Sequence, residues 1–141
     1  MVSGTRDMKL MQIASKWYSD KKLAHCIRVA LYAANDPLIT DKDVQESLWT
    51  IGLLHDILEG TGCTMEEVRQ VLTYSEYNAL KEITHNKEER TYEEHLNDIL
   101  ETNNPIVMTV KRADIKDHLM QKDALTNKQK EKYLPTIKYL L

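Results

Sequence analysis

The sequence contains little of what a chain needs to form tight hairpin turns. Its 141 residues include only four glycines and three prolines, and no Asn-Gly or Asp-Gly dipeptide. Runs in which apolar and polar residues strictly alternate are also scarce. Because β-hairpins depend on such turns and on such alternation, these absences disfavour a β-rich fold.

Other absences narrow the class of protein. The two cysteines, Cys26 and Cys63, form no CxxC pair, which argues against a disulfide scaffold or a thiolate zinc site. No apolar run approaches the roughly 18 residues of a membrane span, and the N-terminus has no apolar signal-peptide region. The net charge of -3 is neither the basic excess of a nucleic-acid binder nor the acidic excess of a disordered tail. We therefore expect a cytoplasmic globular chain with one domain over 1–141.

Apolar residues recur at spacings of three and four, and helix-start signals precede them. The segments TDKD, TMEE, TYEE and TNKQ each carry a threonine three residues before an acid or an amide. In this capping-box pattern both side chains satisfy backbone donors at the start of a helix. The pattern predicts an all-α bundle of about seven or eight helices. Their expected ranges are 7–18, 21–35, 41–59, 64–72, 75–84, 91–101, 104–120 and 127–140.

The segment LLHDILEGTG, residues 53–62, places ionisable groups inside an apolar run. His55 and Asp56 are predicted near the end of the 41–59 helix, with Glu59 one turn beyond His55 on the same side. Because the neighbours are apolar, this turn should face inward, where an unpaired carboxylate is costly. An imidazole and a carboxylate are suitable ligands for a divalent transition metal, so the pair is a candidate metal site.

Two more ligand-type residues interrupt apolar helix faces. His25 borders the apolar face of the 21–35 helix, and Asp114 interrupts the apolar stripe of the 104–120 helix. Each has a simpler interpretation: His25 or His55 alone would be a core or helix-end histidine, and Asp114 alone would be one end of a surface ion pair. Their joint occurrence on three helices favours a shared metal site.

Four blocks of sequence carry a resemblance to a known family. They read HCIRVALYAA, IGLLHDILEGTGCTMEEV, LKEITHNKEERTYEEHLNDI and VKRADIKDHL. Their order resembles the HD-domain metal-dependent phosphohydrolase superfamily, whose dyad matches His55-Asp56. A more specific likeness is to the hydrolase domain of RelA/SpoT-type enzymes and their small stand-alone relatives, and it extends to the closing KEKYLPTIKYLL. The resemblance implies a single compact HD-domain helical bundle.

The resemblance also implies roles for individual residues. The implied metal ligands are His25, His55, Asp56 and Asp114. Mn²⁺ is the expected ion, with other transition metals or Mg²⁺ as alternatives. Family members of this branch remove pyrophosphate from the 3′ side of guanosine tetra- or pentaphosphate. Glu59 matches the first catalytic acid. Lys111 matches the lysine that precedes the family's last aspartate, and we expect it to bind the substrate.

The chain departs from the family pattern at three places. Gly60 replaces the second acid of the family's Glu-Asp pair. His118 replaces the family's asparagine four residues after Asp114, and we expect it to face the metal and to substitute for that asparagine in contacting the nucleotide. YSDKKLAHC, residues 18–26, stands where the family carries Gly-x-Pro-Tyr. These departures favour another nucleotide substrate or a weakened activity.

Basic residues near the mouth of the site are candidates for holding phosphates. These are Lys21, Lys22 and Lys111, although a solvated surface position is the simpler interpretation of Lys21 and Lys22. His85 and His95 are expected to be exposed.

Gly60 and Gly62 are expected to end the long helix in a left-handed conformation.

Three hypotheses follow from the sequence. The first is a metal-dependent phosphohydrolase that acts on a small phosphorylated nucleotide, of the guanosine tetraphosphate type. The second is another HD-type activity, such as a nucleoside monophosphate phosphatase. The third is a non-catalytic regulatory domain that binds a metal or a nucleotide. None requires a nucleic-acid polymer or a membrane, and all leave self-association open.

Overall fold

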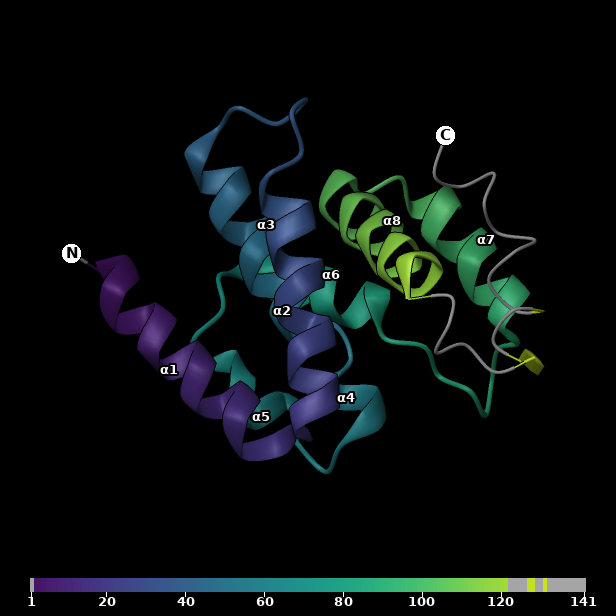
Figure 1. Ribbon diagram of the computed structural model, residues 1–141, viewed down its shortest axis with the longest axis horizontal. Helices are drawn as coiled ribbons and strands as arrows, with labels where there is room; N and C mark the ends of the chain where they lie inside the picture. Colours follow the sequence, from purple (N-terminus) through teal and green to yellow (C-terminus); the bar gives the residue numbers. More distant parts are fainter. Residues whose placement is uncertain (1, 122–126, 129–130, 132–141) are drawn as a thin grey trace.

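A computed structural model describes residues 2–121, 127–128 and 131, and this part of the chain contains α-helices and no strand (Figure 1). Its helices are α1 (Val2–Trp17), α2 (Asp20–Ala34), α3 (Lys42–Leu54), α4 (Ile57–Gly60), α5 (Met65–Arg69), α6 (Tyr74–Ile83), α7 (Tyr92–Thr102) and α8 (Pro105–Met120). The predicted all-α class is therefore confirmed. The helix predicted at 127–140 and the closing block lie outside the described residues, apart from 127–128 and 131.

Helix starts follow the side chains that cap them. Thr91 begins α7 with a complete capping box, as its pattern predicts, and Thr73 forms a second box before α6. At the start of α3 the capping side chain is Asp41 rather than Thr40. Thr64 precedes α5 without a side-chain capping bond. Acceptor side chains thus fix most of these boundaries to within one or two residues of prediction.

The predicted 41–59 helix is wrong, because the chain breaks it into α3 and α4 at the His55-Asp56 turn. Two carbonyls at the end of α3 accept side-chain donors. His55 Nδ1 donates to the Gly52 carbonyl over 2.6 Å, and the Tyr18 hydroxyl donates to the Leu53 carbonyl over 2.8 Å. These donors satisfy carbonyls that a continuing helix would have used, so the ionisable pair lies at a helix end.

The predicted left-handed glycines are also wrong, since neither Gly60 nor Gly62 has a positive φ. The end of α4 is satisfied instead by the Thr61 hydroxyl, which donates to the Ile57 carbonyl over 2.7 Å. Among the described residues other than glycine, a positive φ occurs at Asn103, the C-cap of α7, with φ 53°. Asparagine tolerates this conformation better than most residues.

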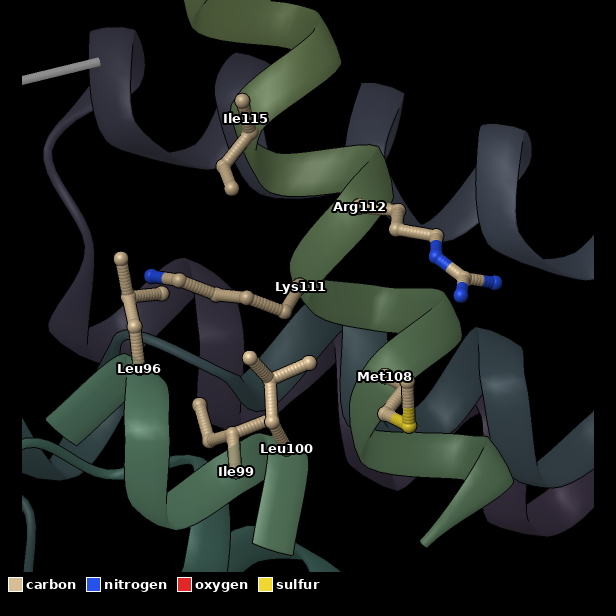
Figure 2. A pocket seen from close by; sticks show the side chains of 7 residues that line it. All are labelled: Leu96, Ile99, Leu100, Met108, Lys111, Arg112 and Ile115. Atoms are coloured by element: carbon tan, nitrogen blue, oxygen red, sulfur yellow. The ribbon is translucent and has the colours of Figure 1, made fainter. Parts of the chain in front are cut away.

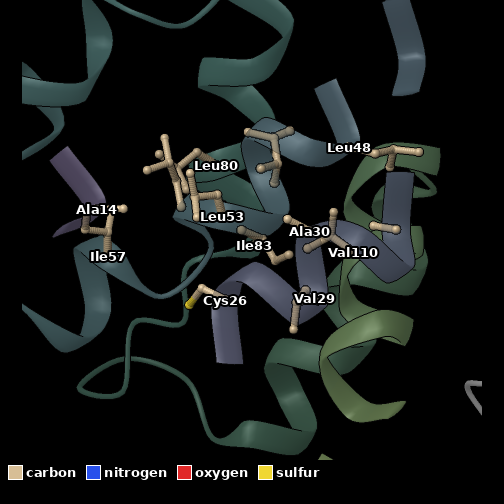
Figure 3. Packing of buried hydrophobic residues seen from close by; sticks show 14 of the residues in the cluster. Ala14, Cys26, Val29, Ala30, Leu48, Leu53, Ile57, Leu80, Ile83 and Val110 are labelled. Carbon is tan, nitrogen blue, oxygen red and sulfur yellow. The ribbon is translucent and has the colours of Figure 1, made fainter. Parts of the chain in front are cut away.

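Helices α2, α3 and α8 form the centre of the bundle, with α1 and α7 on opposite sides of it (Figure 1). Their inner faces bury Val29 and Ala30 of α2, Leu53 of α3 and Val110 of α8 in one apolar cluster (Figure 3). Burial of this apolar surface is the main favourable contribution to folding. It also brings together the three segments that carry the predicted metal ligands.

The crossing of α2 and α3 is unusually close at Gly52. A Cβ atom at this position would lie 2.7 Å from Ala30 Cα, a separation that real Cβ atoms do not tolerate. Glycine at 52 therefore lets the two helices approach, three residues before His55.

Both cysteines are buried and free, so they form no disulfide with each other. Among the described residues, no helix has the length and apolarity required to cross a membrane.

Candidate metal centre

Four side chains from three segments converge beside the core. They are His25 of α2, His55 and Asp56 of the turn after α3, and Asp114 of α8, and each offers a ligand atom within 4.8 Å of every other. His25, His55 and Asp114 are buried, and Asp56 is half-buried. The structure thus brings together all four residues that the sequence nominates.

His25 is held in place by a carboxylate that the sequence analysis missed. Its Nδ1 lies 2.6 Å from Asp117 Oδ2, while its Nε2 lies 2.9 Å from Asp114 Oδ1. Arg28 holds Asp117 through two bonds of 2.7 and 3.0 Å. Spacing in the sequence could have identified this carboxylate. Asp117 follows Asp114 by three residues and Arg28 follows His25 by three, so each pair shares a helix face.

His55 is oriented in the same sense by the backbone. Because a carbonyl only accepts hydrogen bonds, the His55 Nδ1 that faces the Gly52 carbonyl must carry the proton. Its Nε2 then lies 3.2 Å from Asp56 Oδ2 and 3.2 Å from Asp114 Oδ1. Both imidazoles therefore turn Nε2 toward the two carboxylates. Two imidazole nitrogens and two carboxylate oxygens suit a divalent transition metal, so the residues fit the ion that the resemblance implies.

Electrostatics keeps the carboxylates charged. Burial alone would raise the pKa of Asp114, but Lys111 and His55 hold it well below its ordinary value. The pKa of Asp56 is also lowered against burial, by His55 and Lys22. Conversely, Asp56 and Asp114 outweigh burial and raise the pKa of His55 well above its usual range. Both carboxylates therefore remain charged and can bind a cation.

Three cationic or ionisable groups contact the carboxylates from the open side. Lys22 Nζ lies 3.1 Å from Asp56 Oδ2, and Lys111 Nζ lies 3.2 Å from Asp114 Oδ2. His118 Nε2 lies 3.3 Å from Asp114 Oδ1, which places its ring next to the cluster as expected. Lys21 is exposed, but the surface interpretation of Lys22 is wrong because its ammonium group is paired at the site.

A polar cavity of about 180 Å³ opens on this cluster. It is lined by Lys22, His55, Asp56, Glu59, Ile83, His85, Lys87, Tyr92, His95, Lys111, Asp114 and His118. Figure 2 shows Lys111 extending from α8 toward Leu96 of α7, whereas Arg112 points the opposite way. The same Lys111 also lines the polar cavity. Three lysines line the cavity, Lys22, Lys87 and Lys111, and their charges make it suitable for an anion.

Glu59, on the short helix α4, lines the same cavity as His55 and Asp56. Its Oε1 accepts the His85 backbone N–H over 3.0 Å, and its Oε2 lies 3.5 Å from Lys87 Nζ. The loop after α6 therefore fixes the carboxylate.

The predicted exposure of His85 and His95 is wrong. His95 is buried and His85 half-buried, and their rings stack with centroids 4.7 Å apart. His95 lies just before Leu96 and four residues before Ile99, both buried, so it shares the inward face of α7. Burial beside Lys111 lowers the pKa of His95 to about 4.

Neither a family model nor a curated protein sequence matches the chain. Among solved structures, the chain is similar to that of a metazoan ortholog of SpoT, which hydrolyses ppGpp and plays a role in starvation responses. The TM-score is 0.67 and the identity 20%, over 94% of this chain and 83% of the other. At this identity the likeness establishes the fold alone, and it confirms the all-helical HD-domain fold that the resemblance predicts.

Proposed function

We propose that this protein is a metal-dependent phosphohydrolase that acts on a nucleotide of the guanosine tetraphosphate type. The observation that carries the proposal is the convergence of two imidazoles and two carboxylates beside a polar cavity lined by three lysines. The fold supports it, since the structurally similar SpoT ortholog hydrolyses ppGpp.

His25, His55, Asp56 and Asp114 would hold the ion, and Mn²⁺ is the form we favour. When bound, a divalent ion of this kind activates water and polarises a phosphoryl oxygen. The protein prepares the ligands before binding, because Asp117 and the Gly52 carbonyl fix both imidazoles with Nε2 inward.

Lys22, Lys111 and His118 would bind the phosphate oxygens. Each already contacts a carboxylate of the cluster at 3.1–3.3 Å, so each stands beside the place where a phosphate must approach. Their side chains offer N–H donors and positive charge to an anion that the two aspartates alone would repel. His118 would take the part of the family's asparagine as a donor to the nucleotide.

Glu59 would accept or orient a proton during hydrolysis. Its carboxylate lines the cavity and is positioned by the His85 backbone N–H and by Lys87. General acid–base help from such a group is typically worth about 10²–10⁴-fold.

The backbone does not require a glycine at position 60, where the family carries its second acid. Gly60 has no positive φ, and no atom lies within 4 Å of a Cβ built on it. An aspartate at this position would fit without strain. The chain therefore lacks the second acid although its backbone could carry one, and we expect its activity to differ from the family pattern for this reason.

A substrate panel tests the proposal. Purified protein is supplied with Mn²⁺, Co²⁺ or Mg²⁺ and offered ppGpp, nucleoside triphosphates and nucleoside monophosphates. Release of pyrophosphate from ppGpp supports the proposal, and Asp114→Asn should abolish it. Turnover confined to monophosphates would favour the phosphatase alternative. A bound ion without turnover of any nucleotide would favour the non-catalytic regulatory domain.

A further inference from the structure

One wall of the cavity has no part in the proposed chemistry. It is the pair of stacked rings of His85, in the loop after α6, and His95 of α7. The ring planes are 18° apart, and both rings line the same cavity as the ligand residues. The pair is therefore placed to contact whatever part of a substrate lies next to its phosphate.

Hydrogen bonds fix which ring nitrogen of each histidine carries a proton. His85 Nε2 donates to the Arg90 carbonyl over 2.6 Å, and His95 Nε2 donates to the Ile83 carbonyl over 3.1 Å. A carbonyl only accepts, so Nε2 is the protonated atom in both rings. Among the described residues, no hydrogen-bond partner is found for either Nδ1.

The buried ring is uncharged at neutral pH. The pKa of His95 is lowered to about 4 by its burial and by Lys111, so its Nδ1 retains a lone pair. A neutral imidazole nitrogen of this kind accepts hydrogen bonds and cannot serve as a donor to phosphate oxygens. It complements an O–H or N–H group.

The positions of the charges separate the cavity into two functional parts. Lys22, Lys111 and His118 surround the carboxylate cluster and suit the phosphate. The histidine pair suits a hydrogen-bond donor on the part of the substrate that adjoins the phosphate. A cavity of about 180 Å³ is smaller than the roughly 300–1,000 Å³ that encloses a drug-sized ligand, so it takes a phosphate and the adjoining sugar rather than a whole nucleotide.

We propose that Nδ1 of His95, on the ring stacked against His85, accepts a hydrogen bond from the ribose 2′-hydroxyl next to a 3′-phosphate group, and so makes the site selective for ribonucleotides over their 2′-deoxy counterparts. This inference rests on the proposed function, because it assumes that a nucleotide phosphate binds at the carboxylate cluster. Sites built to bond a hydroxyl discriminate strongly against analogues that lack it, since the acceptor is then left unpaired.

The test compares ppGpp with 2′-deoxy-ppGpp as the ratio of their kcat/KM values. Wild type should favour ppGpp by roughly tenfold or more. His95→Phe keeps an aromatic ring but removes the acceptor, and it should bring the ratio close to one. His85→Phe keeps the stacked ring beside His95 and should leave the ratio unchanged. Lys87→Ala, next to His85, is the matched control: it changes the charge of the same wall and should leave the ratio unchanged. If His95→Phe fails to fold, wild type with 2′-fluoro-2′-deoxy-ppGpp decides the inference: its 2′ substituent is close in size to a hydroxyl but has no hydrogen to donate, so it should be disfavoured as strongly as the 2′-deoxy nucleotide.

Equal handling of the two nucleotides by wild type would overturn the inference, as would an unchanged ratio in His95→Phe. If wild type hydrolyses neither nucleotide, the proposed function fails, and the ratio of their dissociation constants, measured by calorimetry on the same variants, decides this inference separately. If neither nucleotide binds, both ideas are rejected.

Discussion

Glu59 shows how one residue's chemistry can be tested apart from metal binding. Its carboxylate is held by the loop after α6 and is not one of the four ligand-type groups. Glu59→Gln keeps the shape and the acceptor for the His85 backbone N–H but loses the proton-accepting group. Turnover should fall by about 10²–10⁴-fold while Mn²⁺ affinity stays unchanged. Wild-type turnover in this variant would remove Glu59 from the mechanism.

Asp117 is a second residue whose role has a sharp consequence. It is almost fully buried, bonded to His25 Nδ1 at 2.6 Å and held by Arg28. Loss of a carboxylate that orients a ligand histidine typically costs 10–100-fold in metal affinity. Asp117→Asn should therefore weaken Mn²⁺ binding by about this factor, as measured by calorimetric titration.

The matched control is Asp98→Asn, which breaks an ion pair with Arg90 on the partly exposed side of α7, away from the cluster. It should leave Mn²⁺ affinity as in wild type. An equal affinity in both variants would mean that Asp117 has only a structural part.

At the residue scale, the sequence predicted the convergence of the four ligand-type residues but not their supporting contacts. Apolar periodicity shows that His25 and Asp114 interrupt a buried face, and this was sufficient to nominate them. It does not show that Asp117 and the Gly52 carbonyl would orient the rings. Spacing places Asp117 on the same helix face as Asp114, but which atoms meet depends on how two helices approach each other.

At the element scale, the crossing of α2 and α3 positions two of the ligands. Gly52→Ala would place a methyl group 2.7 Å from Ala30 Cα and push the helices apart. Forced overpacking typically costs about 1–3 kcal/mol. The free energy of unfolding from urea denaturation should fall by this amount, and Mn²⁺ affinity should fall with it, because His25 and His55 lie on either side of the crossing.

Gly60→Ala is the control for this substitution, because the space around Gly60 is open and its φ is not positive. Replacing glycine by alanine in a compatible helical position stabilises by about 0.4–1 kcal/mol. Destabilisation by Gly60→Ala that equals that of Gly52→Ala would contradict the close-crossing account.

Helix positions were predictable from capping side chains and apolar spacing, except that α1 begins at Val2 rather than at residue 7 and that the 41–59 helix is broken. The 41–59 segment keeps helical periodicity throughout, yet it breaks after Leu54. The break arises from donors supplied by His55 and Tyr18 to the last carbonyls of α3. Tyr18 is 35 residues from Leu53 in sequence, so this competition is invisible to any local pattern.

At the scale of the whole molecule, ion binding and folding should be linked. The site is assembled from α2, the turn after α3, and α8, so it exists only when these segments are packed together. An ion that binds the folded form alone stabilises it by about 2.7 kcal/mol at a concentration 100 times its dissociation constant. The melting temperature should rise on the order of 10 °C with saturating Mn²⁺.

This rise should be absent in Asp114→Asn, which removes one ligand from the centre of the cluster. No rise in the wild type at saturating Mn²⁺ would argue against a preformed site.

The fold class could be predicted at this scale because the chain has few turn residues and many helix-capping residues. This composition leaves few alternatives to a helical bundle. The character of the cavity could not. His95 lies on the inward face of α7, but its neutral state depends on burial beside Lys111, which comes from α8. Side chains from separate elements create that environment only after the bundle has formed.

The most direct test of the account is the rate of ppGpp hydrolysis by one wild-type preparation before chelation, after chelation with EDTA, and after Mn²⁺ is restored. The account predicts that pyrophosphate release stops when the ion is removed and returns when Mn²⁺ is added back, and that Asp114→Asn remains inactive throughout. Hydrolysis that persists unchanged after chelation, or a wild-type protein that binds Mn²⁺ at His25, His55, Asp56 and Asp114 yet releases nothing from ppGpp, would contradict it.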